Sequence, residues 1–289
     1  MNSGTQRASP RFVVLPVLIL LAGGVASAEN INPANDGSKY AWSENLGWLN
    51  AQPSGPGGPG VQVSDSGLSG YMWSENAGWV NLSCLNSATC VASNYGVAND
   101  GCGKLSGYAW SENTGWIKFA PANCSGDPTC GVRINPATGI FSGRAWSENA
   151  GWITFSATTP TAYQVATSWR RAAPTLAKGL LVGKSGVSDV SLSWVAVSGA
   201  STYDVVRGGL NALRSSNGNF QTATQACVAN DTAGTSYTTT TGATPSVGDG
   251  FWFLVRGSNC GGAGTYDSGA PKQVGSRDAG INASGNSCP

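Results

Sequence analysis

Short runs of alternating apolar and polar residues recur along the first half of the chain, separated by turn-forming residues. In one run Leu105 and Ala109 fall on one face of an extended chain, while Tyr108 and Trp110 fall on the other. Successive side chains of a strand point to opposite faces, so this period of two predicts a β-strand. The turn-forming sequence SENTG follows, and the alternation then resumes with Ile117. The run therefore predicts a β-hairpin.

The predicted turn fixes how the two strands face each other. Gly115 closes the turn, where it supplies the positive φ that a bulged type I turn requires. This register places Trp110 opposite Trp116 on one face, with Ile117 and Phe119 on the other. A cross-strand aromatic pair contributes about 0.5 to 1.5 kcal/mol beyond the burial of its rings.

The hairpin sequence occurs four times. The copies are AWSENLGW from Ala41, YMWSENAGW from Tyr71, YAWSENTGW from Tyr108 and RAWSENAGW from Arg144. Their first tryptophans are 31, 37 and 36 residues apart, and a short LSG or FSG motif precedes the last three copies. The first copy lacks this motif, so we interpret it as an abbreviated terminal unit. Self-similarity at this period predicts stacked supersecondary units, here forming a rigid rod or slab.

The placement of the tryptophans separates two interpretations. Eight of the eleven tryptophans lie in the hairpins. Buried aromatic rings are the commoner case, so we expect a buried ladder that stabilises the stack. In the alternative, the aromatic face is open to water and forms a binding surface. The candidate ligand-binding residues are then Trp42, Trp48, Tyr71, Trp73, Trp79, Tyr108, Trp110, Trp116, Trp146 and Trp152.

Residues 1–28 predict a secretory signal peptide. Arg7 and Arg11 precede an apolar run from Phe12 to Ala22, and small residues end at Ala28. The apolar run is too short to span a membrane, so we expect no transmembrane segment. The mature chain is expected to be secreted, extracellular or on a cell surface, with a periplasm as the alternative compartment.

Composition narrows the classes of function. Charged residues make up 11% of the chain and the formal net charge is +1, so we expect no nucleic-acid partner. The chain contains no histidine. This absence excludes Ser-His-Asp and Cys-His catalysis and His-ligated zinc in their usual forms. The sequence predicts no cofactor, no metal site and no enzymatic activity.

Carboxylate chemistry is the enzymatic alternative that survives. Glycoside hydrolysis needs a pair of carboxylates, and each repeat contains one. These glutamates are Glu44, Glu75, Glu112 and Glu148. Four equivalent residues one repeat apart do not make a single asymmetric catalytic pair. We therefore expect each glutamate and its asparagine neighbour to accept hydrogen bonds from backbone donors of the turn.

Cysteines behind a signal peptide predict a disulfide framework. The eight are Cys84, Cys90, Cys102, Cys124, Cys130, Cys227, Cys260 and Cys288. The pairs Cys84–Cys90 and Cys124–Cys130 share one spacing and equivalent places after successive hairpins, so we expect a local bridge in each. Five cysteines in the first half and three in the second then require either one bridge between the halves or two free thiols.

A second part of the chain begins after the last repeat. The sequence RRAAP over 170–174 marks the expected boundary between a repeat domain, 29–171, and a second domain, 172–289, which ends in a Gly/Ser-rich tail. From Pro174 on, the chain resembles a fibronectin type III domain. The matching segments are VSLSWVAVSGASTYDVVR with Trp194, TSYTTT around Tyr237, and GFWFLVRGSNCGGAG from Gly250. The expected fold class is therefore all-β, with tandem antiparallel β-hairpin repeats followed by a fibronectin type III-like β-sandwich.

The resemblance has two further implications. Its topology would bring Cys227 near Cys260, which leaves Cys288 on the tail to pair with Cys102. The chain departs from the family at Phe251, where a corner tyrosine is usual, and it has no RGD sequence, so integrin-type adhesion is not implied. The repeats themselves resemble tandem AWSENxGW units of secreted bacterial proteins without an assigned role, a resemblance that implies export and modularity alone.

Three functional hypotheses follow. The leading one is a secreted or cell-surface, non-enzymatic structural or adhesive protein built from β modules, with a surface protein or an extracellular glycan as partner. The second is a carbohydrate-binding protein that uses tryptophan and tyrosine platforms. The third and least favoured is a carboxylate-dependent glycoside hydrolase.

Overall fold

The computed structural model describes residues 1, 29–54, 59–122, 126–186, 189–240, 245–273 and 275–289. The predicted signal peptide, apart from Met1, lies outside the described residues. The fold is all-β, with 42% of residues in strands, 8% in helices and antiparallel sheets throughout. Within the described part of the chain no helix is both long and apolar enough to cross a membrane.

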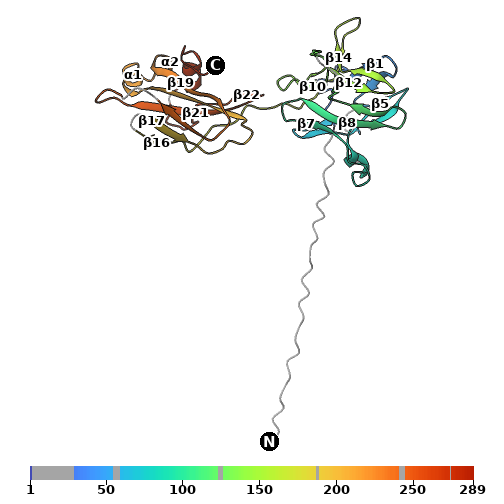
Figure 1. Ribbon diagram of the computed structural model, residues 1–289, viewed down its shortest axis with the longest axis horizontal. Helices are drawn as coiled ribbons and strands as arrows, with labels where there is room; N and C mark the ends of the chain where they lie inside the picture. Colours follow the sequence, from blue (N-terminus) through green and yellow to red (C-terminus); the bar gives the residue numbers. More distant parts are fainter. Residues whose placement is uncertain (2–28, 55–58, 123–125, 187–188, 241–244, 274) are drawn as a thin grey trace.

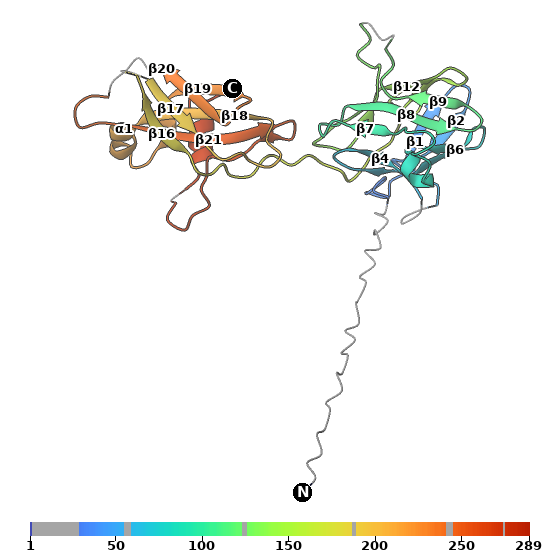
Figure 2. The same cartoon turned by 60° about the horizontal axis from the view of Figure 1, so that its bottom comes forward.

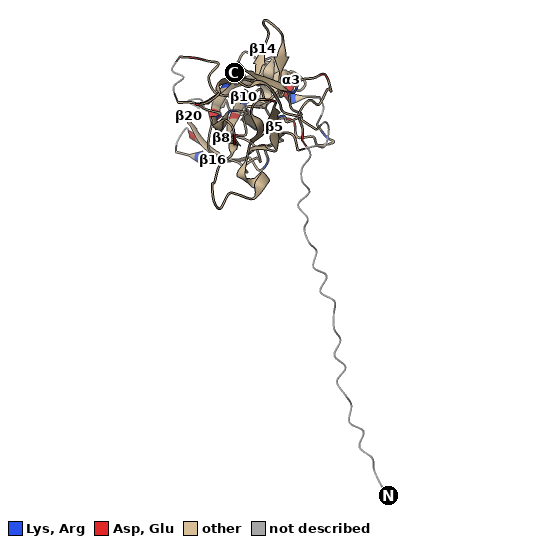
Figure 3. Ribbon diagram, turned by 90° about the vertical axis from the view of Figure 1, so that its right-hand side faces the viewer, with Lys and Arg blue, Asp and Glu red and all other residues tan. Residues whose placement is uncertain are grey.

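The chain forms two bodies, which Figures 1 and 2 show side by side. The repeat body has its core residues between Ile31 and Trp169. The C-terminal body has its core residues between Ala177 and Cys288. Each body therefore buries apolar side chains of its own. Figure 3 shows that charged residues are few and scattered along the ribbon.

Each repeat folds as an antiparallel hairpin. The hairpin strands are β1 (Tyr40–Ser43) with β2 (Gly47–Asn50), β5 (Tyr71–Ser74) with β6 (Gly78–Asn81), β8 (Leu105–Ser111) with β9 (Gly115–Lys118), and β12 (Arg144–Ser147) with β13 (Gly151–Thr154). Trp110 pairs with Trp116 across the third hairpin, as predicted. Gly115 has a φ of 70°, so the glycine does supply the left-handed turn residue.

The four hairpins join into a closed sheet of eight strands. Strand β2 pairs with β5, β6 with β8, and β9 with β12. Strand β13 of the last hairpin then pairs with β1 of the first, where Ser43 lies opposite Ile153. The repeats therefore form a closed ring and not the predicted rod or slab, and the first repeat is not a free end of the array. Closure gives both outer strands a partner and leaves the ring without a free edge.

Side chains that point into the ring form the centre of the repeat body. The inward cross-strand pairs are Ala41 with Leu49, Met72 with Val80, Ala109 with Ile117, and Ala145 with Ile153. All of them are at most 3% exposed. Alanine faces Leu or Ile in three pairs, so small and large side chains alternate across a narrow interior.

Short strands form a second layer next to the ring, and three of them continue its sheet. They are β3 (Gln62–Val63), β4 (Gly67–Ser69), β7 (Val97–Asn99), β10 (Arg133–Ile134), β11 (Phe141–Ser142), β14 (Ser156–Ala157) and β15 (Tyr163–Gln164), together with the 3₁₀ turn η1 (Cys84–Ser87). In the third repeat the glycine of the LSG motif lies on β8 and pairs with Val97 of β7 in this layer. Gly107 has a φ of 85°, and a Cβ there would lie 2.2 Å from the backbone oxygen of Gly96. The motif thus marks a close approach between backbones.

The C-terminal body contains two sheets and three short helices. One sheet has the order β16 (Leu181–Ser185), β17 (Asp189–Ser193), β20 (Ser236–Thr240), and the other β19 (Thr224–Thr232), β18 (Thr202–Gly209), β21 (Phe251–Asn259), β22 (Gly262–Ala263). The helices are α1 (Leu210–Ser215), α2 (Phe220–Ala223) and α3 (Arg277–Asn282). A buried ion pair joins Arg256 on β21 to Asp204 on β18, with 3.0 Å between Nε and Oδ2.

The disulfides agree with some predictions and correct others. Cys84 and Cys90 form the predicted local bridge. Cys130 is disulfide-bonded, and its predicted partner Cys124 lies outside the described residues. Of the two predicted alternatives, a bridge between the halves or two free thiols, the structure has the bridge. It pairs Cys102 with Cys260.

The remaining bridge pairs Cys227 with Cys288, so the predictions Cys227–Cys260 and Cys102–Cys288 are both wrong. The reason is the path of the tail. It folds back as α3, which packs against α2, and buries Cys288 to 5% exposure beside β18 and β19. The turn after β21 instead carries Cys260 to the repeat body, where its Sγ lies 3.6 Å from the carbonyl oxygen of Gly101.

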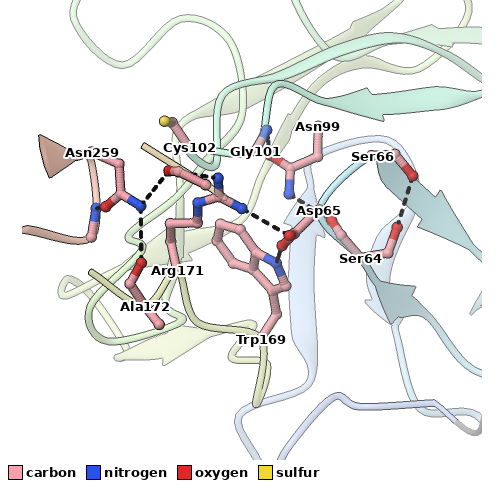
Figure 4. Close-up of polar contacts among 12 residues, drawn as sticks. Ser64, Asp65, Ser66, Asn99, Gly101, Cys102, Trp169, Arg171, Ala172 and Asn259 are labelled. Atoms are coloured by element: carbon pink, nitrogen blue, oxygen red, sulfur yellow. Dashed lines mark hydrogen bonds and ion pairs between the residues drawn. The ribbon is translucent and has the colours of Figure 1, made fainter. Parts of the chain in front are cut away.

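Polar contacts surround the bridge between the bodies (Figure 4). Arg171 forms an ion pair of 2.8 Å with Asp65 of the repeat body, and it also donates to the carbonyl oxygen of Gly199 at 3.3 Å. The indole of Trp169 donates to Asp65 at 2.8 Å. Asn259 donates to the carbonyl oxygen of Gly199 at 2.9 Å. Arg171 thus touches both bodies beside the disulfide.

Candidate ligand-binding groove

The tryptophans of the hairpins lie on the outside of the ring. The second tryptophan of the first three repeats is well exposed: Trp48 by 45%, Trp79 by 47% and Trp116 by 44%. The other hairpin tryptophans are partly exposed. The expectation of a buried ladder is therefore wrong. Both faces of each strand are apolar, but the narrow interior holds alanine and aliphatic side chains, so the indoles take the outer face.

Each pair of tryptophans is arranged edge to face, which suits the quadrupoles of the rings. Ring centroids are 4.6 to 4.9 Å apart in the four hairpins. In the first three repeats a tyrosine packs beside the second tryptophan, for example Tyr108 at 6.0 Å from Trp116. Arg144 takes this place in the fourth repeat, with its guanidinium 4.7 Å from the ring centroid of Trp152. Every hairpin thus presents an aromatic outer wall.

The serine and asparagine of each SEN turn join neighbouring hairpins. Ser111 and Asn113 both donate to the carbonyl oxygen of Ala77 in the preceding hairpin, at 3.1 and 3.2 Å. The equivalent serine–asparagine pairs make the same contact at the other junctions, with the carbonyl oxygens of Leu46, Thr114 and Ala150. The repeated spacing therefore positions each turn against the neighbouring hairpin and spaces the aromatic walls around the ring.

We expected the glutamates to accept hydrogen bonds from backbone donors of the turn, and in the described residues they do not. Glu75 accepts a hydrogen bond of 3.2 Å from the indole of Trp73, and Glu148 one of 3.3 Å from Trp146. The buried hydroxyl of Ser74 accepts from the turn instead, from the backbone N–H groups of Asn76 and Ala77. That prediction was wrong because the turn donors point inward, toward serine, while glutamate points outward.

A groove of about 790 Å³ lies between the second and third hairpins. Its lining residues are Tyr71, Ala77, Gly78, Trp79, Asn81, Ser87, Thr89, Ser93, Tyr95, Trp110, Glu112, Asn113 and Trp116. The two hairpins supply two walls. The loop over 82–96, closed by the Cys84–Cys90 bridge, supplies the third. A smaller pocket of about 390 Å³ adjoins it at Ser93, Asn94, Tyr95, Tyr108 and Trp116.

Trp116 lies at the centre of the aromatic lining. Its ring centroid is 4.6 Å from that of Trp110 and 5.2 Å from that of Tyr95. Burial raises the pKa of the Tyr95 hydroxyl above its ordinary value, and the neighbouring Tyr71 acts in the same direction. Tyr95 therefore stays a neutral hydrogen-bonding group over the whole physiological range.

The structure divides the ten candidate residues. Four line the groove, and Tyr108 lines the adjoining pocket. The other five line neither of these two cavities: Trp42, Trp48, Trp73, Trp146 and Trp152. Sequence reasoning missed Tyr95 and the polar residues of the loop, since they stand outside the repeat. The Cys84–Cys90 spacing was the one signal that a closed loop follows the second hairpin.

No protein-family model matches the chain, and no curated protein matches it at a significant level. Nor do the described residues contain any group of three or more acidic or cysteine side chains that could hold a metal ion. The chemistry available at the site comes from its lining, which offers aromatic faces, hydroxyl and amide groups and a single carboxylate, Glu112.

Proposed function

We propose that this protein is a secreted or cell-surface, non-enzymatic carbohydrate-binding protein whose ligand lies in the groove between the second and third hairpins. The observation that carries the proposal is the exposure of Trp79 and Trp116 on facing walls of that groove. Large exposed apolar patches on soluble proteins are typical of binding sites, which supports the proposal. Aromatic faces accept the C–H face of a sugar ring.

The polar lining supports the same ligand class. Asn81, Ser87, Thr89 and Ser93 line the groove beside the rings. Their hydroxyl and amide groups both donate and accept hydrogen bonds, which matches the hydroxyl groups of a sugar. The volume lies within the range of about 300 to 1,000 Å³ that is typical of small-ligand sites.

Export is part of the proposal. It is supported by the sequence of residues 1–28 and by the disulfides Cys84–Cys90, Cys102–Cys260 and Cys227–Cys288, since such bonds persist in oxidising compartments.

We also propose the division into domains at residues 171 and 172, with a fibronectin type III-like second domain. Separate hydrophobic cores on either side of the boundary support the division. Two antiparallel sheets of three and four strands, with Trp194 and Tyr203 in the core between them, support the sandwich. No integrin-type adhesion follows from this likeness.

A structural or adhesive role is the second candidate. It is favoured by the covalent bridge Cys102–Cys260, which ties the two bodies beside the chain connection. In that case the exposed tryptophans would contact a surface protein. Glycoside hydrolysis is not favoured, because Glu112 is the one carboxylate that lines the groove in the described part of the chain and the reaction needs two.

The test is a titration of cell-wall, cellulose and chitin fragments, followed by tryptophan fluorescence and calorimetry. We expect at least one glycan to bind the wild-type protein, and Trp116→Ala to weaken that binding by about tenfold or more. Trp48→Ala is the matched control, because Trp48 has the same repeat position and the same exposure but lies outside the groove. Equal loss in both variants, or no binding of any fragment, would refute the proposal.

A further inference from the structure

The lining of the groove contains one acidic side chain and no basic one, and this charge can distinguish glycans from one another. We infer that it prefers glycans built of amino sugars whose amine is free and protonated, over N-acetylated, neutral or acidic ones. This inference rests on the proposed function, since it names the ligand class of the same site. The juxtaposition that carries it is a carboxylate, Glu112, in the lining of the same groove as the aromatic rings of Trp79, Trp110 and Trp116.

The charge of the lining is negative. Among the thirteen described residues that line the groove, Glu112 is the one acidic side chain, and none is lysine or arginine. A ligand carboxylate or sulfate in the groove would therefore meet a like charge, and no lysine or arginine of the groove lining would pair with it. A ligand ammonium would meet an opposite charge.

Glu112 is available for a ligand, unlike its equivalents in two other repeats. Glu75 and Glu148 each accept an indole hydrogen bond from the tryptophan two residues earlier. Glu112 is exposed, and within the described residues it accepts no hydrogen bond and forms no ion pair. Of the two hairpins that line the groove, the third thus carries an unengaged carboxylate, while the glutamate of the second is engaged by Trp73.

Aromatic side chains on the outside of the ring of strands already hold cations of the protein itself. The ammonium of Lys118 lies 5.6 Å from the ring centroid of Tyr108, and the guanidinium of Arg144 lies 4.7 Å from that of Trp152. Both distances fall within the about 6 Å of a cation–π contact. The aromatic side chains that line the groove with Glu112 also lie on the outside of the ring of strands. A ligand ammonium in the groove would therefore interact with both a carboxylate and aromatic faces.

Lys118 also sets the direction of the ligand. Its ammonium lies over Tyr108, which lines the adjoining pocket and not the groove. Like-charge repulsion keeps a ligand ammonium away from that end. The amine is therefore placed at the Glu112 end, and the hydroxyl-rich remainder of the sugar extends along Tyr95.

The experiment compares oligomers of one length: glucosamine, N-acetylglucosamine, glucose and glucuronic acid, measured by calorimetry at about pH 5.5, where sugar amines are protonated. We expect the glucosamine oligomer to bind about five- to tenfold more tightly than its N-acetylated form. Glu112→Gln should abolish this preference by weakening the binding of the glucosamine oligomer. Glu75→Gln, at the same repeat position outside the groove, should keep it.

A second readout does not depend on any variant. Raising the salt concentration should weaken binding of the glucosamine oligomer to the wild-type protein and leave the N-acetylated oligomer unaffected. If the N-acetylated or glucose oligomer binds as tightly as the amine, or if Glu112→Gln keeps the preference, the inference fails while carbohydrate binding stands. If none of the four oligomers nor any other glycan binds, the proposed function itself fails.

Discussion

The hydroxyl of Ser43 donates a hydrogen bond of 3.2 Å to the carbonyl oxygen of Ala150, 107 residues further along the chain. Asn45 donates to the same oxygen at 3.1 Å. Neighbouring repeats are joined by this same pair of contacts, as between Ser111, Asn113 and Ala77. The first and last hairpins thus meet as adjacent repeats do, and the ring closes by repetition of one junction.

The junction serines should contribute strongly to stability. The hydroxyl of Ser74 is fully buried, donates to the carbonyl oxygen of Leu46 at 2.9 Å and accepts two backbone N–H groups. Ser74→Ala leaves those buried groups unpaired, so we expect the free energy of unfolding to fall by about 1 to 3 kcal/mol in urea denaturation. Ser106→Ala, at an exposed position of β8, is the control. Equal stability of the two variants would contradict the role of the junction.

The buried ion pair of the C-terminal body should be costly to break. Asp204 and Arg256 are 4% and 7% exposed, and Asp204 also accepts from the backbone N–H of Asp231. Asp204→Asn leaves the guanidinium buried without a counter-charge, so we expect a loss of about 3 to 5 kcal/mol. The exposed pair Asp65–Arg171 provides the comparison, and Asp65→Asn should cost about 1 kcal/mol or less. Similar losses in both variants would be the contrary result.

The bridge between the bodies should restrict their relative motion without holding either core together. In the double variant Cys102→Ser, Cys260→Ser we expect each body to remain folded, because the cores are separate. Small-angle scattering should show a wider distribution of distances between the bodies. Replacing Cys227 and Cys288 instead should leave that distribution unchanged and lower the stability of the C-terminal body by about 2 to 4 kcal/mol. Identical scattering from both variants would oppose this account.

Stability should fall at alkaline pH because of Tyr266. Burial raises the pKa of Tyr266 well above its ordinary value of 10.0, and its hydroxyl is buried without a hydrogen-bond partner in the described structure. The unfolded chain therefore releases this proton at lower pH than the folded chain. The contribution is fully present below pH 10 and is lost as pH rises toward the folded pKa. Between pH 10 and 11, wild type should lose about 1 kcal/mol more than Tyr266→Phe in denaturant titrations. A parallel pH dependence of the two would refute the assignment.

The local pattern of apolar, polar and turn-forming residues predicted the hairpins well, and there is a physical reason for this. The pairing of Trp110 with Trp116 depends on a five-residue turn and on Gly115, so the information lies within a few neighbouring residues. The choice of face could not be read in the same way. Ala109 and Trp110 both belong to apolar faces, and only closure of the ring decides that the smaller residue points inward.

The local sequence pattern could not predict contacts between residues that are far apart in the chain. The pairing of β1 with β13 joins the ends of the repeat array, and nothing in the period of one hairpin distinguishes a ring from an open stack. The same limit applies to Cys288, whose partner is set by the return of α3, and to Tyr95, which the loop after the second hairpin carries to Trp116. The groove therefore could not be predicted without the structure, although four of its aromatic residues were named from the repeats.

The most direct test of the central claim follows the indole N–H signals of the tryptophans by NMR while a binding glycan is added. The account predicts that the signals of Trp79, Trp110 and Trp116 shift, while those of Trp48 and Trp152, which do not line the groove, stay in place. Shifts of equal size in all hairpin tryptophans, or in Trp48 and Trp152 alone, would contradict a single site between the second and third hairpins.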